Sequence, residues 1–141
     1  MKIKLYVGCA LGGLSGPEKN DFLEKVVKLK NNLKERGFDV LEFLGLGEQT
    51  PQEVYDHDIK GCVATCDAML AICDHPSTGM GYEMATVIEK RGLSVLAVAH
   101  KDSFVSKVVR GISKPNFRFE RYTDFEKEIP LLVGKYIKVS R

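Results

Sequence analysis

The sequence contains no tryptophan and only four cysteines, none of them in a CxxC pair. Cys62 and Cys66 lie one helical turn apart, with His57 and His75 near them in the sequence, but this spacing matches no standard zinc motif. The thiols are therefore predicted to be reduced and buried. No metal ion and no organic cofactor is expected.

Long hydrophobic runs are also missing. Near the start, the uninterrupted apolar run covers only residues 5–7, far short of the core of a signal peptide. No stretch reaches the length of a transmembrane helix. The protein is expected to be cytoplasmic and to have no membrane partner.

The sequence has little excess charge of either sign. Its 21 lysines and arginines nearly balance 19 acidic residues, for a net charge of +2, which argues against a surface dedicated to nucleic acid. A lysine cluster does occur within one helical segment that also carries acidic residues. That segment is predicted to expose a solvated face with Lys25, Lys28, Lys30 and Lys34.

What is present is typical of one globular domain, which we expect to span residues 1–141, with 44% hydrophobic and 28% charged residues. Strand-like segments alternate with helix-like ones. The predicted strands cover residues 2–8, 38–44, 68–73, 93–99 and 116–122. The predicted helices cover residues 18–36, 78–91, 103–112 and 125–139, the last interrupted near Pro130, and a further helix begins with a capping box at Thr50 and Glu53. That further helix is predicted to turn Tyr55, Ile59, Cys62, Val63 and Cys66 inward.

This alternation predicts an α/β fold, a flavodoxin-like doubly wound parallel sheet of five strands in the order 2-1-3-4-5. The topological switch point then falls between the first and third strands. The loops at their carboxyl ends are both glycine-rich: GCALGG, which contains Gly8, Cys9, Gly12 and Gly13, and DHPSTGMG. The candidate site is therefore expected where these two loops meet.

The second loop has the features of an anion site. Gly79 and Gly81 open a helix, so free N–H groups, room for close approach and the Ser77 hydroxyl coincide there. A loop that uses glycine only to turn is the alternative. Neither common phosphate-binding motif is satisfied.

Two carboxylates accompany this loop. Glu83 follows in the same helix, where the helix N-terminus is expected to keep it ionised, although an apolar stripe of Gly81, Met84, Ala85 and Ile88 would turn it toward solvent. Asp58 lies on the flank of the preceding helix, where a plain surface role is the alternative. Paired carboxylates around a glycosidic bond can act as nucleophile and acid.

The segments GCALGG, DHDI, CDAMLAICDHPSTGMGYE, GLSVLAVA and VVRGI together resemble the nucleoside 2-deoxyribosyltransferase superfamily, and within it the 2'-deoxynucleoside 5'-phosphate N-hydrolases. The resemblance covers most of the chain. It implies that Glu83 is the catalytic nucleophile and that Asp58 assists the departing base. It also implies that Ser77, Gly79 and the GCALGG loop surround the 5' end of the substrate.

Serine at position 77 favours a 5'-phosphate, because the transferases that handle free nucleosides tend to carry an aspartate there, which would repel the anion.

Three departures from the family pattern stand out. Cys9 and Leu11 replace donors of the first loop, and Tyr6 lies one place from the tyrosine that commonly orients the nucleophile, with Leu5 in its slot. The resemblance also implies a homodimer whose subunits share residues, with Asn116 as the candidate contributed across the interface.

The sequence therefore predicts an N-glycosidase acting on a nucleoside 5'-monophosphate. Two alternatives stay open: a nucleoside 2-deoxyribosyltransferase that moves deoxyribose from one base to another, and a nucleotide sensor without activity.

Overall fold

The computed structural model describes residues 2–11, 13–44 and 47–138. Its five parallel strands are β1 (Lys4–Cys9), β2 (Asp39–Glu42), β3 (Ala68–Ile72), β4 (Ser94–His100) and β5 (Phe117–Tyr122), in the order β2-β1-β3-β4-β5. This confirms the predicted fold class and strand order. The fully buried β3 pairs with β1 and β4.

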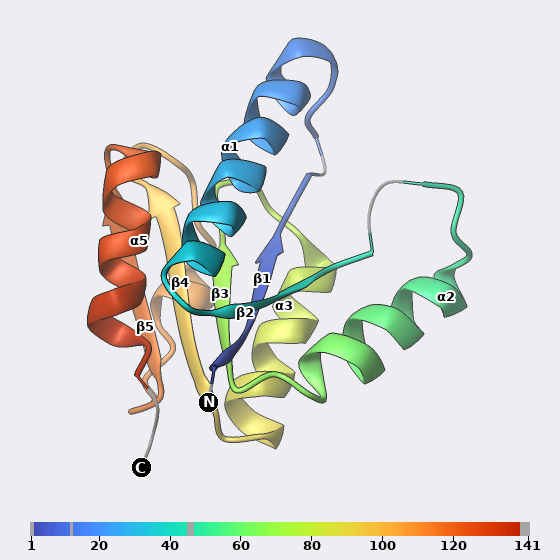
Figure 1. Cartoon of the computed structure of the whole chain (residues 1–141), viewed down its shortest axis with the longest axis vertical. Helices are drawn as coiled ribbons and strands as arrows, with labels where there is room; N and C mark the ends of the chain where they lie inside the picture. Colours follow the sequence, from blue (N-terminus) through green and yellow to red (C-terminus); the bar gives the residue numbers. More distant parts are fainter. Residues whose placement is uncertain (1, 12, 45–46, 139–141) are drawn as a thin grey trace.

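Helices cover both faces of the sheet (Figure 1). On one face lie α1 (Gly16–Glu35) and α5 (Phe125–Tyr136). On the other face lie α3 (Thr78–Ala85), its continuation η2 (Thr86–Lys90), η1 (Asp56–Val63) and the short α4 (Lys107–Arg110). The helix α2 (Pro51–Tyr55) leads into η1 and projects beyond the sheet (Figure 1).

Both η segments are turns of π-helix. The Ala64 N–H reaches the Ile59 carbonyl five residues back at 2.8 Å, and the Arg91 N–H reaches the Thr86 carbonyl at 3.0 Å. The predicted capping box is confirmed, since the Thr50 side chain accepts from the Glu53 N–H while the Glu53 carboxylate accepts from the Thr50 N–H. π-Helical turns occur frequently at functional sites.

Two predictions about helix faces and one about the continuity of a helix are wrong. Tyr55 is 43% exposed rather than inward, because α2 projects beyond the sheet. Lys30 is only 7% exposed; its ammonium group pairs with Glu42 at 3.3 Å, and it lies over the Phe43 ring. Helix α5 runs through Pro130 without interruption.

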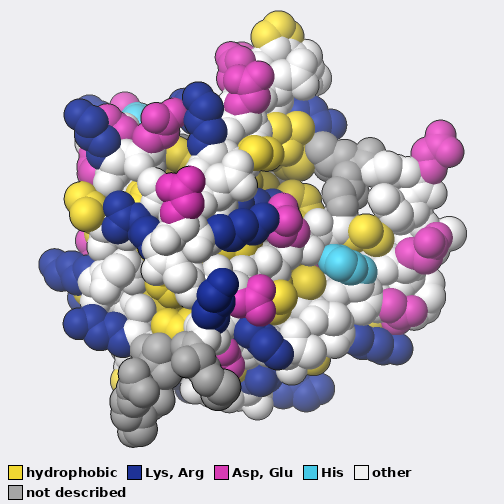
Figure 2. Space-filling model, in the orientation of Figure 1, with side chains coloured by type: hydrophobic (Ala, Val, Ile, Leu, Met, Phe, Trp, Pro, Cys, Tyr) yellow, Lys and Arg dark blue, Asp and Glu magenta, His cyan; other side chains and the backbone are white. Residues whose placement is uncertain are grey.

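The remaining surface has mixed charge. Figure 2 shows basic and acidic side chains interspersed over the face that α1 and α5 cover. None of the helices in the described ranges is long and apolar enough to cross a membrane. All four cysteines are free, and three of them, Cys62, Cys66 and Cys73, are buried as predicted, while Cys9 is half-buried.

Candidate active site

Glu83 lies in the interior beside β1. It is 9% exposed, and its Oε2 accepts a hydrogen bond of 2.7 Å from the Tyr6 hydroxyl. Met80 and Val87, three residues before and four after Glu83, are buried with it on one helix face. The predicted apolar stripe is confirmed at Met84 and Ile88, which are buried, whereas Ala85 is exposed. Glu83 is buried beside it, which excludes the alternative of a solvent-facing glutamate.

Gly8 makes room for this carboxylate. A Cβ atom at Gly8 would lie 3.1 Å from Met69 Cε and 3.6 Å from both Glu83 Oε1 and the Tyr6 ring. Since side chains alternate along a strand, Tyr6 and Gly8 share the face that looks toward α3, whereas Leu5 and Val7 pack against α1 and α5. The concern about the register of Tyr6 was therefore misplaced, because Tyr6 is the residue that reaches Glu83.

Burial changes the acidity of Glu83. Desolvation raises its pKa to about 7, the Tyr6 hydrogen bond lowers it, and the charge of Asp58 raises it further. The expectation that the helix N-terminus keeps this carboxylate firmly ionised is therefore wrong. Its pKa instead lies at neutrality, the range that suits groups taking part in chemistry near pH 7.

Asp58 comes from η1 and is 8% exposed, so it is not a surface aspartate. Its Oδ1 accepts a 2.7 Å hydrogen bond from the Leu44 N–H, where the chain leaves β2. Burial raises its pKa, an effect opposed by the Leu44 hydrogen bond and by the charge of His57. A raised pKa favours the protonated form that can donate a proton.

Hydrogen bonds from one arginine link the two helical segments that carry these carboxylates. The Arg91 guanidinium, at the end of η2, donates to the backbone carbonyls of Val63 at 2.9 Å and Cys66 at 2.6 Å, where η1 ends. Asp58 and Glu83 thereby face one open cleft of about 530 Å³, within the range of small-molecule sites. Its lining residues are Gln49, Pro51, Val54, Tyr55, Asp58, Ile59, Thr78, Gly79, Tyr82 and Glu83.

Ser77 is the N-cap of α3, and its hydroxyl accepts from the Met80 N–H at 3.1 Å. The Gly81 N–H is already bonded to the Ser77 carbonyl at 3.2 Å, so Gly81 offers no free donor. Gly79 lines the cleft with Glu83, whereas Ser77 and Gly81 line a second cavity of about 330 Å³ on the other side of the α3 N-terminus. Thr78 belongs to both linings.

Of the remaining predicted residues that the structure describes, none lines the cleft shared by Glu83 and Asp58. Cys9 packs toward α1 and α5, with burial raising its pKa to about 11. Gly13 has a φ of +83°, a conformation suited to glycine, and Gly12 lies outside the described residues. Asn116 lies at the amino-terminal edge of the sheet, where its amide donates to the carbonyls of Ile88 and Leu93.

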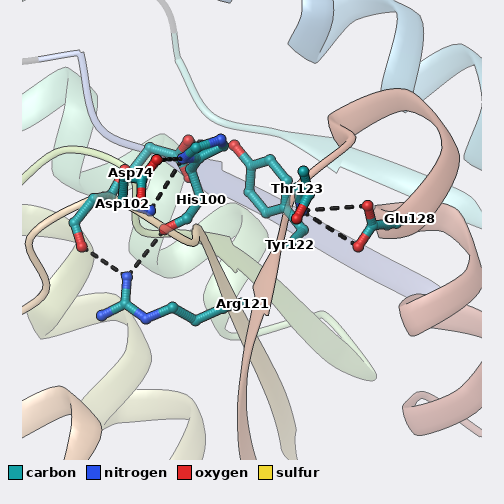
Figure 3. Close-up of polar contacts among 8 residues, drawn as sticks. Asp74, His100, Asp102, Arg121, Tyr122, Thr123 and Glu128 are labelled. Atoms are coloured by element: carbon teal, nitrogen blue, oxygen red, sulfur yellow. Dashed lines mark hydrogen bonds and ion pairs between the residues drawn. The ribbon is translucent and has the colours of Figure 1, made fainter.

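A polar cluster lies at the carboxyl ends of β4 and β5 (Figure 3). The Tyr122 hydroxyl donates to Asp74, and Arg121 donates to the carbonyls of His100 and Ser103. Asp74 therefore contacts β5 through Tyr122 and does not line the cleft of Glu83. Asp67, just before β3, accepts a 2.8 Å hydrogen bond from the Lys4 N–H of β1, which is a structural role.

Comparison with known proteins finds one curated relative and one solved structure that are similar to this chain. A curated protein of Thermofilum pendens (strain DSM 2475 / Hrk 5), named "Putative 2'-deoxynucleoside 5'-phosphate N-hydrolase 1", is 35% identical over 130 residues, covering 84% of this chain and 90% of that protein. The solved structure of the Clostridium botulinum CMP N-glycosidase BcmB superposes with a TM-score of 0.70 at 16% identity, over 92% of this chain and 97% of that one. No family model matches the chain.

The fold and the relatives define an α/β enzyme of the nucleoside 2-deoxyribosyltransferase superfamily. Within that superfamily, the chain belongs to the 2'-deoxynucleoside 5'-phosphate N-hydrolase family.

Proposed function

We propose that this protein cleaves the bond between base and sugar in a nucleoside 5'-monophosphate, with 2'-deoxyribose as the expected sugar. The name of the Thermofilum relative supports the reaction class. The observation that carries the proposal is the pairing of two buried carboxylates, Glu83 and Asp58, at one open cleft. Such a pair can serve as nucleophile and acid in glycoside cleavage.

In this proposal Glu83 attacks C1' of the sugar through a carboxylate oxygen. The electron pair of the C1'–N bond leaves with the base, and Asp58 donates a proton to that base. The result is a glycosyl-enzyme ester on Glu83. The pKa of about 7 leaves a large fraction of Glu83 ionised at neutral pH, as a nucleophile requires.

Water then resolves the ester. The ionised Asp58 removes a proton from the attacking water, the new bond forms at C1', and the Glu83 carboxylate is released. Tyr6 positions Glu83 during both steps through its hydroxyl group. Because that hydrogen bond favours the ionised carboxylate, it also makes Glu83 a better leaving group.

The phosphate is proposed to lie at the N-terminus of α3. Thr78 and Gly79 are the first two residues of this helix, whose N–H groups have no partner within the helix, and a Cβ on Gly79 would meet nothing closer than Ser77 Oγ at 3.8 Å. The Ser77 hydroxyl still has its own proton to donate while it caps Met80. Gly81 contributes open space rather than a donor.

A homodimer with shared sites is part of the proposal, and it rests on the family resemblance. Asn116 stays the candidate contributed by the partner. Within one chain both N–H groups of its amide are engaged, so only its side-chain oxygen would face the neighbouring site.

Base release from a panel of nucleoside monophosphates, followed by HPLC with and without an added acceptor base, tests the function. Hydrolysis predicts free base and sugar phosphate whether or not an acceptor is present. New nucleotide formed from the acceptor would instead support transfer, which differs only in what resolves the ester. Nucleotide binding without any release of base would support the sensor.

A further inference from the structure

Two tyrosines stand exposed at the mouth of the cleft. Tyr55 ends α2 and is 43% exposed, and Tyr82 lies in α3 and is 54% exposed. Their ring centroids are 6.4 Å apart with planes inclined at 50°. Exposed aromatic rings that converge on one cleft indicate a binding surface.

The position of the pair relates it to the carboxylates. Tyr82 immediately precedes Glu83, and Tyr55 lies three residues before Asp58, so each ring accompanies one carboxylate along the same cleft. Pro51, Val54 and Ile59 complete an apolar wall around the rings. A flat, weakly polar group joined to a sugar at Glu83 would therefore extend along this wall.

We propose that Tyr55 and Tyr82 form a stacking platform for the nucleobase, and that bases are selected here mainly by stacking area. This rests on the proposed function, since it places the departing base in the same cleft. Stacking tolerates every base because each presents a π-face, so the platform predicts broad acceptance with purines bound more tightly than pyrimidines.

Because the sequence contains no tryptophan, the fluorescence of one introduced tryptophan can be followed without background from other indoles. A Tyr82→Trp substitution gives the protein a single indole on the platform, and Glu83→Gln in the same chain prevents turnover during titration. Fluorescence is then followed while 2'-deoxyguanosine 5'-monophosphate or 2-deoxyribose 5-phosphate is added. The matched control is Val27→Trp on α1, where the replaced residue is also 54% exposed but lies on the other face of the sheet.

We expect the nucleotide to quench the platform indole by stacking, the sugar phosphate to leave its emission unchanged, and neither ligand to affect the control. Calorimetry on the same sample measures binding independently. Binding of the nucleotide without quenching of the platform indole would overturn the proposal. So would a blue shift of its emission that appears with rising protein concentration, because a second copy of the chain would then cover the pair.

Substitutions in the active enzyme test the same idea. Tyr82→Ala and Tyr55→Ala should each raise KM about 5- to 150-fold, with a smaller change in kcat, whereas Tyr82→Phe and Tyr55→Phe keep the ring and should stay near wild type. Equal KM values for the Ala and Phe variants would refute the platform. If wild type releases base but the platform indole is not quenched, the platform proposal is refuted and the proposed function stands. If the indole is quenched but wild type releases no base, the proposed function is refuted and the platform proposal stands.

Discussion

Replacing Glu83 by glutamine should stabilise the fold while abolishing turnover. The side chain is 9% exposed, and its pKa is raised by burial from the ordinary 4.5 to about 7. A carboxyl group whose pKa is raised in the folded state binds its proton more tightly there than in the unfolded chain. Its contribution to stability is therefore present below pH 4.5 and is lost as the pH rises through about 7.

The size of the loss follows from the two pKa values. About 2.5 pH units at 1.36 kcal/mol each give roughly 3 kcal/mol above pH 7, where the folded protein must keep a buried charge that the unfolded chain leaves in water. Glutamine has nearly the same shape, can still accept the Tyr6 hydrogen bond and never ionises. Glu83→Gln should therefore be more stable than wild type by up to about 3 kcal/mol at pH 8.5, with little difference at pH 4.5.

Urea denaturation at several pH values measures this difference. Glu24→Gln is the matched control, because Glu24 is exposed on α1, so its replacement should leave the pH dependence unchanged. Equal stability of wild type and Glu83→Gln at pH 8.5, or a less stable variant, would refute the reasoning. A gain in stability with loss of activity would mark Glu83 as a site where function costs folding free energy.

Three further predictions concern the Tyr6 hydrogen bond, the phosphate site at Ser77 and the oligomeric state. Tyr6→Phe removes the hydrogen bond that lowers the Glu83 pKa, so the acidic limb of the kcat/KM profile should move about 1–2 pH units higher; an unmoved limb would exclude this role. Ser77→Ala should lower kcat/KM for a nucleotide about ten- to a hundredfold and leave the free nucleoside nearly unchanged, while Ser77→Asp should shift preference toward nucleosides. Equal wild-type cleavage of nucleoside and nucleotide would contradict that assignment. Light scattering should show at least a dimer under assay conditions, and an active monomer would end the shared-site proposal.

The fold could be predicted because its signals are local. Apolar runs such as β3, buried throughout, indicate a strand covered on both faces, and the capping box at Thr50 indicates where a helix begins. The strand order places β1 beside β3 and so brings Gly8 of the first loop near Glu83. The cleft itself is lined by α2, η1 and the start of α3, a contribution that the strand order does not predict.

The direction of side chains was harder to predict. Periodicity alone favoured a solvent-facing Glu83, because the glycines of α3 obscure its second buried face, and only the position of Glu83 beside the expected anion site favoured a functional role. Tyr55 was assigned inward because it falls on the same helical face as Ile59 and Cys62, although α2 projects beyond the sheet. Lys30 is buried because Glu42 and Phe43, distant in sequence, provide a charge partner and a ring. Such tertiary contacts leave no periodic signal in the sequence.

The measurement that tests the central claim most directly is the trapping of the glycosyl-enzyme. Wild-type protein is mixed with 2'-deoxyguanosine 5'-monophosphate, quenched in acid within one turnover, and examined by mass spectrometry as intact protein and as peptides. The account predicts an adduct of one deoxyribose 5-phosphate on Glu83, formed as guanine is released, and no adduct on Glu83→Gln. Base release by Glu83→Gln at a rate within about tenfold of wild type would contradict it, because the activation barrier would then have changed by only ~1.4 kcal/mol.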